Sequence, residues 1–306
     1  MRRDTVGPLL GAALRSGARP RAAIIGFPFD EGVQRNGGRT GAASAPDHVR
    51  SALSRLMPDP VLGSAFEDLL EHVEDAGNIG AGGGLRESQG RLATRVRKYL
   101  DLGALPIIIG GGHETAFGHF LSYADNGQRV TLMNFDAHAD VRELIDGHGH
   151  SGSPFRQALL HPSGAARHYI AVALQPQSVA RTHLNFLAEH GADWLWRSEV
   201  TYDAVDELFA QLDGPTLVSF DMDAVDESYA PGVSAPCAGG LSTDLWLHAA
   251  RCAGRCRAVT SVDLCEVNPQ VDRGGQTARL AALTLWSVLR GRVEREIAST
   301  DSSSGS

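Results

Sequence analysis

The sequence lacks the features that mark several common classes of protein. It has only four cysteines among 306 residues. Cys252 and Cys256 are one helical turn apart, but no second pair completes a zinc-finger spacing. This scarcity favours reduced thiols in a cytoplasmic protein over a disulfide scaffold. No apolar run is long enough to span a bilayer, and the formal net charge is −8. We therefore expect neither a nucleic-acid partner nor a membrane protein.

The two ends of the chain differ from its middle. Residues 1–20 place several arginines around a short apolar run that glycine and proline interrupt, without a convincing cleavage site. We expect them to form a flexible N-terminal arm. Residues 299–306 are rich in serine and glycine and predict a disordered tail. No linker or repeat divides residues 21–298, which we expect to be a single domain.

Short apolar runs alternate with amphipathic stretches throughout this domain. The predicted strands are residues 21–27, 105–109, 130–135, 169–174, 216–220 and 258–264. Stretches with apolar residues at helical spacing lie between most of them. Continuous apolar strands that alternate with helices are typical of a parallel sheet covered on both faces. The sequence therefore predicts an α/β fold with a mainly parallel sheet.

Acidic and histidine side chains follow several of these strands. Asp136, His138 and Asp140 occupy every second position, so an extended backbone directs them to one side. Asp221 and Asp223 repeat this spacing after a later strand. In parallel α/β folds, sites form beyond the carboxyl ends of the strands. The alternative for each stretch alone is an aspartate-rich turn or a solvated histidine.

Together with His113 these residues offer four carboxylates and two imidazoles. That set has too many oxygens for one tetrahedral zinc and suits two harder divalent ions, with Mn²⁺ the best match. Such a pair lowers the pKa of water towards neutrality and so supports hydrolysis. A zinc protease of the H-E-x-x-H type is excluded, because Phe117 occupies the position of the second histidine. The glycines before His113 also lack the lysine and hydroxyl residue of a phosphate-binding loop.

Four segments together resemble the ureohydrolase superfamily, which includes arginase, agmatinase and formimidoylglutamase. They are residues 110–114 (GGGHE), 134–140 (NFDAHAD), 219–226 (SFDMDAVD) and 263–269 (DLCEVNP). The resemblance implies an arginase-like three-layer α/β/α fold, a catalytic domain over residues 21–298 and a homo-oligomer, either trimer or hexamer.

The resemblance also implies the roles of the site residues. Two manganese ions per subunit would be held by His113, Asp136, His138, Asp140, Asp221 and Asp223. Which carboxylates bridge the ions stays open. Asp140 would also handle a proton, and Glu266 would contact the substrate amidine, where its negative charge suits a cationic group.

Three loops resemble the formimidoylglutamase branch in particular. They are residues 32–42 (GVQRNGGRTGA), 140–142 (DVR) and 151–155 (SGSPF), whereas residues 171–180 depart from that pattern. N-formimidoyl-L-glutamate, a compound of histidine degradation, has two carboxylates, which arginine binds with a planar fork. The expected substrate contacts are Arg35, Asn36, Arg39, Arg142 and Ser151, and His150 is the histidine expected to assist proton transfer.

Two other functions stay open at this point. A guanidino-compound hydrolase (agmatinase, guanidinobutyrase or arginase) would use the same centre and release urea. A non-catalytic metal-binding paralogue would keep the ligands without the reaction. Six intact ligand positions disfavour the paralogue, because unneeded buried charges are costly to retain.

Overall fold

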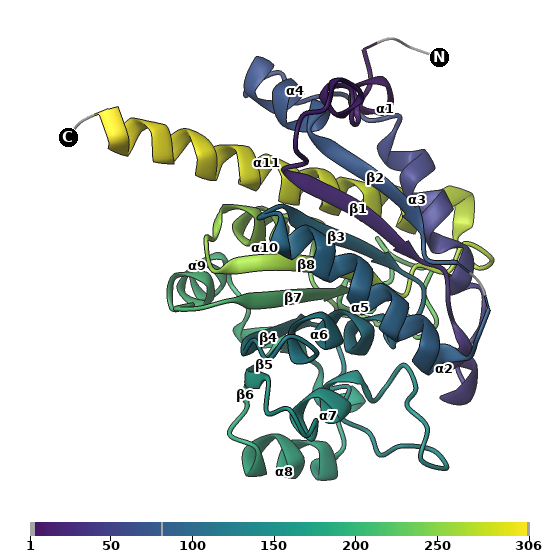
Figure 1. The fold of residues 1–306 in the computed structure, drawn as a ribbon. Coiled ribbons are helices and arrows are strands. Elements are labelled where there is room, and N and C mark those ends of the chain that lie inside the picture. Colours follow the sequence, from purple (N-terminus) through teal and green to yellow (C-terminus); the bar gives the residue numbers. More distant parts are fainter. Residues whose placement is uncertain (1–3, 81, 305–306) are drawn as a thin grey trace.

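A computed structural model of the chain describes residues 4–80 and 82–304 (Figure 1). Its centre is an eight-stranded parallel sheet with the order β2-β1-β3-β8-β7-β4-β5-β6. The strands are β1 (Ala22–Phe27), β2 (Val73–Asn78), β3 (Leu105–Gly110), β4 (Val130–Phe135), β5 (Ala166–Leu174), β6 (Asp193–Trp196), β7 (Thr216–Asp221) and β8 (Val259–Cys265).

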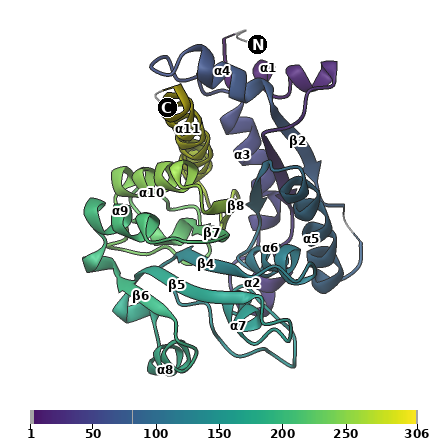
Figure 2. The same ribbon diagram turned by 60° about the vertical axis from the view of Figure 1, so that its left-hand side comes forward.

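Helices cover both faces of the sheet, which Figure 2 shows from a second direction. One face carries α3 (Ala45–Leu53), α4 (Ser64–Glu71), α9 (Tyr202–Ala210), α10 (Thr243–Arg255) and α11 (Gln276–Ser304). The other face carries α5 (Leu85–Asp101), α6 (Thr115–Ala124), α7 (Pro154–Leu159) and α8 (Arg181–Glu189). Two short helices, α1 (Val6–Leu9) and α2 (Glu31–Arg35), lie near the amino end of the chain. The predicted three-layer α/β/α fold is confirmed.

The central strands are buried along their whole length, which explains their continuous apolar runs. Every residue of β3, β4 and β7 is buried. The rings of Phe135 and Phe220 stack with centroids 5.1 Å apart, and Trp246 of α10 meets Phe220 edge-on at the same separation. Aromatic pairs of this kind add to the free energy of apolar burial. This packing fixes the strand ends that carry the predicted ligands.

The sequence did not predict β2 and β6, which form the two edges of the sheet. β2 reads Val-Glu-Asp-Ala-Gly-Asn and only its first residue is buried. β6 has four residues, of which the first is exposed and the others half-buried. An edge strand packs on fewer sides and is often charged or short. It therefore lacks the continuous apolar run by which the central strands were recognised.

The chain ends are more ordered than we expected. Val6 in α1 is buried, and its backbone N–H donates to Leu56 O at 2.9 Å. The expectation of a flexible arm over residues 1–20 is thus wrong for this part, while residues 1–3 lie outside the described residues. At the other end, α11 continues to Ser304. The expected disordered tail from residue 299 is therefore helical up to that point.

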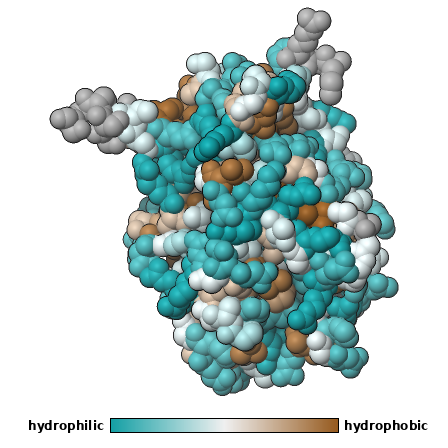
Figure 3. All heavy atoms as spheres, in the orientation of Figure 1, coloured by the Kyte–Doolittle hydropathy of each residue, from teal (hydrophilic) through white to brown (hydrophobic). Residues whose placement is uncertain are grey.

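The surface gives no indication of a membrane-spanning segment. No helix within residues 4–80 and 82–304 is long and apolar enough to cross a bilayer. The face shown in Figure 3 is largely hydrophilic, with small, separate apolar patches. Single exposed apolar side chains of this kind are ordinary on folded proteins.

Four neighbouring strands carry the predicted metal ligands and the predicted amidine contact Glu266. His113 follows β3, Glu266 follows β8, Asp221 ends β7, and residues 136–140 follow β4. These strands are consecutive in the sheet, in the order β3-β8-β7-β4. Because all of them are parallel, their carboxyl ends meet at one edge. Residues far apart in sequence are thereby brought to a single place.

Candidate active site

A tight glycine turn places His113 at the end of β3. A Cβ atom on Gly111 would lie only 2.1 Å from the backbone oxygen of Phe29. That oxygen accepts a hydrogen bond from the Gly112 N–H at 2.9 Å. Only glycine allows the two backbones to approach so closely. The glycines therefore direct His113 into the space beyond the strand ends.

The first group of ligand atoms surrounds Nδ1 of His113. This nitrogen lies 3.3 Å from Asp136 Oδ2, 2.8 Å from Asp140 Oδ2 and 3.1 Å from Asp221 Oδ2. All four side chains are buried. Their ligand atoms are mutually close enough to share one ion.

The second group adjoins the first through Asp136. Nδ1 of His138 lies 3.2 Å from Asp136 Oδ1 and 3.1 Å from Asp223 Oδ2. Asp136 thus turns one carboxylate oxygen to each group. The sequence left the bridging residue open, and the structure places Asp136 between the two groups.

Two residues of the site have a strained backbone. Asp140 has φ of 47° and Glu266 has φ of 69°, a left-handed conformation that residues other than glycine rarely adopt. Such strain concentrates at functional sites, where surrounding contacts enforce it. For Glu266 these contacts include its N–H, which donates to Gly111 O at 2.8 Å. Its carboxylate Oε1 accepts from the His113 N–H, also at 2.8 Å.

The carboxylates are crowded in a way that fits divalent cations. Burial, followed by the charge of Asp136, raises the pKa of Asp221 to about 6. Burial and the charge of Asp221 raise the pKa of Asp223 well above its ordinary value. Asp223 Oδ1 has no hydrogen-bond partner in the described part of the chain. Buried, repelling carboxylates of this kind are costly without a cation, so the residues fit a metal pair.

The same negative charges raise the pKa values of the two imidazoles, His113 and His138. The charge of Asp223 is the largest influence on His138 and raises its pKa above the ordinary value, against the effect of burial. Burial lowers the pKa of His113, but hydrogen bonding with Asp136, Asp140 and Asp221 outweighs it and the pKa is raised. Without metal, both rings therefore hold a proton that an ion would have to displace.

A cavity of about 440 Å³ opens onto both ligand groups. Its wall includes metal-ligand candidates, Glu266 and four of the five predicted substrate contacts. Those four are Asn36, Arg39, Arg142 and Ser151. Glu266 Oε2 is buried and has no hydrogen-bond partner among the described residues. The cavity thus brings cationic donors and an unpaired carboxylate oxygen to the same place.

The polar wall is partly held by its own hydrogen bonds. Asn36 accepts from Arg142 Nη1 at 3.2 Å and donates to Ser151 Oγ at 3.1 Å. More of the guanidinium donors of Arg39 are engaged, because its Nε donates to Ser234 O at 3.0 Å and its Nη2 to Val233 O at 2.8 Å. Arg142 therefore keeps more of its donors available than Arg39.

Two residues expected at the site lie elsewhere. Arg35 does not line the cavity, because its guanidinium binds Gly149 O and the Glu31 carboxylate. His150 is buried and also absent from the cavity wall. Its Nε2 donates to Glu143 O at 2.8 Å, and its Nδ1 accepts from the Gly152 N–H at 3.1 Å. Both ring nitrogens are thus bonded to the backbone of their own loop, and the structure does not bring His150 to the cavity where it was expected to assist proton transfer.

A family model described as "Arginase family" matches residues 20–290 of the chain. This match covers the whole sheet and every ligand described above. The chain belongs to the arginase family. The superfamily resemblance inferred from the four sequence segments is thereby confirmed.

Relatives within the arginase family are similar over most of their length. A formimidoylglutamase of Geobacillus thermodenitrificans is 37% identical over 271 residues, which are 85% of this chain and 81% of that protein. A formimidoylglutamase of Chromobacterium violaceum is 34% identical over 289 residues, which are 91% of this chain and 90% of that protein. The crystal structure of Trypanosoma cruzi formiminoglutamase with Mn²⁺ superposes with a TM-score of 0.84, at 33% identity, over 90% of this chain and 94% of that one.

A buried hydrogen-bond network supports His113 from behind. Its Nε2 lies 2.9 Å from Ser219 Oγ, which donates to Asp263 Oδ1 at 2.5 Å. The other oxygen of Asp263 lies 2.6 Å from Nδ1 of His119. Histidine ligands commonly use their second nitrogen in this way, which fixes the ring and its tautomer. Nδ1 of His113 is thereby left for the ion.

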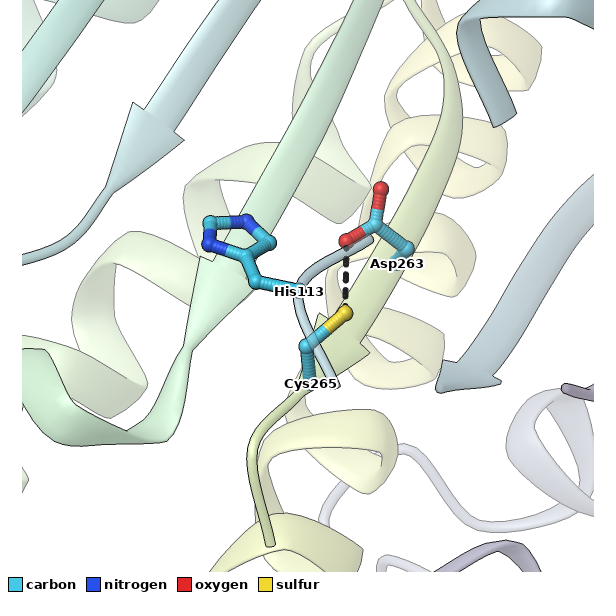
Figure 4. A group of neighbouring side chains, drawn as sticks. All are labelled: His113, Asp263 and Cys265. Atoms are coloured by element: carbon cyan, nitrogen blue, oxygen red, sulfur yellow. Dashed lines mark hydrogen bonds between the residues drawn. The ribbon is translucent and has the colours of Figure 1, made fainter. Parts of the chain in front are cut away.

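Cys265 joins this network without forming a third metal group. Figure 4 shows Cys265 and Asp263 on β8 beside His113, with the thiol donating to Asp263 Oδ1 at 3.3 Å. These three residues have ligand-type atoms close together. However, Asp263 already accepts from Ser219 and bonds His119, and His113 Nδ1 is surrounded by the other carboxylates.

Sequence reasoning missed the roles of His119 and Asp263. His119 and Asp263 lie within a helix and a strand and are separated by 144 positions, so no local spacing links them. The one available signal was a polar residue inside an apolar run, such as Asp263 within β8.

Proposed function

We propose that this chain hydrolyses N-formimidoyl-L-glutamate to L-glutamate and formamide, using two Mn²⁺ ions per subunit. The observation that carries the proposal is the composition of one cavity, where two metal-ligand groups adjoin Arg142 and the unpaired oxygen of Glu266. The substrate has complementary charges, namely a cationic amidine and two carboxylates. Relatives named formimidoylglutamase at 32–37% identity support this choice among the reactions of the family.

The metal pair would be held by two sets of ligands that share one residue. His113, Asp136, Asp140 and Asp221 form the first set, and Asp136, His138 and Asp223 form the second. When bound, the ions supply Lewis-acid activation of water, which makes water nucleophilic near neutral pH. The network of Ser219 and Asp263 keeps the His113 ring oriented for this role.

The substrate would be oriented by charges of both signs on the cavity wall. Glu266 Oε2 is free to accept a hydrogen bond from the amidine N–H. Arg142 offers its guanidinium fork to a carboxylate, with Asn36 fixing one side of the fork. Arg39, Asn36 and Ser151 extend the polar wall. The amidine would lie towards Glu266 and a carboxylate towards Arg142.

Asp140 would carry the proton of the reaction. Water adds to the formimidoyl carbon, and the bond from this carbon to the glutamate nitrogen breaks. The leaving nitrogen needs a proton, which a carboxylate on the cavity wall can deliver. Asp140 lines the cavity and its Oδ2 lies beside His113 Nδ1. General acid–base assistance of this kind is worth about 10²–10⁴-fold in rate.

We further propose the setting in which the enzyme works. Residues 21–298 would form one catalytic domain that acts in histidine degradation in the cytoplasm, as a trimer or hexamer of identical chains. The single continuous sheet supports one domain. All four cysteines are free thiols, as a reducing compartment maintains them.

A panel of substrates tests the proposal. The Mn²⁺-loaded protein is incubated separately with formimidoylglutamate, agmatine, arginine and guanidinobutyrate, and formamide, ammonia and urea are measured. We expect formamide from formimidoylglutamate and no urea from the other three compounds. Urea release would instead identify a guanidino-compound hydrolase. Mn²⁺ binding without turnover of any of the four compounds would identify a non-catalytic metal-binding paralogue.

A further inference from the structure

A second cluster of metal-ligand side chains lies between α9 and α10, which neighbour each other in the helical layer (Figures 1 and 2). His248 and Cys252 are four residues apart on α10, so they lie on the same side of that helix. Asp206 faces them from α9. Its Oδ1 lies 3.0 Å from His248 Nε2 and 3.2 Å from Cys252 Sγ. The sulfur lies 3.5 Å from the same nitrogen.

This triangle of donor atoms has the size of one face of a zinc tetrahedron. With zinc bonds of about 2.0 Å to oxygen and nitrogen and about 2.3 Å to sulfur, tetrahedral geometry separates the ligand atoms by about 3.3–3.6 Å. The observed separations of 3.0, 3.2 and 3.5 Å follow the same order, with the pairs that include sulfur longer. Small side-chain movements would therefore seat an ion.

The surroundings leave this place open to an ion and a water molecule. The Cys252 residue is 5% exposed, while the side chains of His248 and Asp206 are 22% and 57% exposed. The neighbouring cations are directed elsewhere, since Arg251 and Arg255 both pair with Glu294. None of the three ligand residues lines the cavity of the active site.

We propose that Asp206, His248 and Cys252 bind one zinc ion, with water as the fourth ligand, and that this ion ties α9 to α10. A donor set of one thiolate, one imidazole and one carboxylate favours zinc over manganese, because thiolate is a soft ligand. The active-site groups contain no thiol and favour the harder ion. The two sites thus differ in metal as well as in place.

Binding changes the protonation of Cys252. Without metal, the sulfur carries a proton, because the thiol donates a hydrogen bond to Asp206 Oδ1. Zinc binds the thiolate, so the S–H bond breaks as the S–Zn bond forms and the proton passes to the buffer. Binding should therefore release this proton.

Cobalt(II) in place of zinc tests the proposal, because a cobalt–thiolate bond gives a near-ultraviolet charge-transfer band. The Mn²⁺-saturated protein receives one equivalent of Co²⁺, and its spectrum is compared with those of variants. We expect the band in the natural protein and in Cys256→Ser, whose thiol is on the same helix end but contacts Phe209 O instead. The band should be lost in Cys252→Ser and in His248→Ala.

Melting temperatures and hydrolysis rates of the same variants give two further measurements. Zinc should raise the melting temperature of the natural protein and of Cys256→Ser, but not of Cys252→Ser. Hydrolysis by the manganese enzyme should be the same in all these variants. The absence of a band in the natural protein, or its persistence in Cys252→Ser, would overturn the proposal. A band that survives in Cys252→Ser and disappears in Cys265→Ser would place the ion at β8 instead.

Discussion

Arg142 and Arg35 show how two arginines expected to contact the substrate take different positions. Arg142 lines the cavity, whereas Arg35 holds Gly149 and Glu31. Arg142→Met removes a charged donor from the proposed carboxylate site. Because such hydrogen bonds contribute about 1.5–3 kcal/mol, KM for formimidoylglutamate should rise about 10–100-fold, with a smaller change in kcat.

Arg35→Met is the matched control for this experiment. It removes the same charge, yet KM should change little, because this guanidinium does not meet the substrate. Steady-state kinetics compare KM of the two variants. Their melting temperatures verify that both are folded. An equal rise in KM for both variants would contradict the assignment of Arg142 as the carboxylate contact.

Ser219 links His113 to Asp263 and should affect metal binding without touching the ion. Ser219→Ala leaves His113 Nε2 without its acceptor and removes one of the two donors to Asp263 Oδ1, the other being the Cys265 thiol. Loss of such an outer partner weakens metal binding about 10–100-fold. We expect this loss in a Mn²⁺ titration. Ser122→Ala is the control, because this buried hydroxyl donates only to the backbone oxygen of His119, and its variant should bind Mn²⁺ normally.

The raised pKa values of His113 and His138 predict that manganese binding depends on pH. Both rings hold a proton in the metal-free protein around neutral pH, and Mn²⁺ must displace it. Raising the pH lowers the cost of removing that proton, so the affinity for Mn²⁺ should increase, by about tenfold per pH unit for each proton released. Titrations between about pH 6 and 8 measure this slope. An affinity independent of pH across this range is incompatible with protonated imidazoles.

At the scale of elements, the order of the strands determines where the site forms. The apolar runs of β3, β4, β7 and β8 are visible in the sequence because these strands are buried on both faces. Their adjacency is not visible, since it depends on how helices cross between strands. The ligands could therefore be predicted as a set. The role of Asp136 between the two groups needed the structure.

The amino-terminal helix α1 belongs to the folded domain, and Val6 allows a test. Its side chain packs into the core, so Val6→Ala should lower the free energy of unfolding by about 1–3 kcal/mol. Val61→Ala makes the same change at a side chain that is 79% exposed and should stay within about 0.5 kcal/mol of the natural protein. Urea unfolding compares the two. Equal stability of both variants would restore the flexible arm that the sequence suggested.

Residues such as His150 show where sequence reasoning ends. A histidine close to a ligand loop is an attractive proton carrier, but its role depends on the partners of each ring nitrogen. Here the partners are Glu143 O and the Gly152 N–H, which are set by the local path of the backbone. Likewise, the pairing of His119 with Asp263 follows from packing between α6 and β8. Neither arrangement leaves a spacing that can be read along the chain.

At the scale of the whole molecule, one polar cavity stands at the carboxyl edge of an otherwise apolar sheet. Its acidic groups concentrate at the metal centre, and Arg39 and Arg142 face the same space. The overall charge of −8 therefore does not oppose an anionic substrate, because local charge governs a pocket. The fold supplies the metal centre, and the loops supply the choice of substrate.

The central claim is that the bond to the glutamate nitrogen is cleaved with manganese bound. It is tested most directly by following formimidoylglutamate, isotopically labelled at the formimidoyl carbon, by nuclear magnetic resonance. We predict that the label appears in formamide with an equal amount of glutamate, and only when Mn²⁺ is present. Label in N-formylglutamate with release of ammonia, or no turnover by protein that holds two manganese ions, would contradict it.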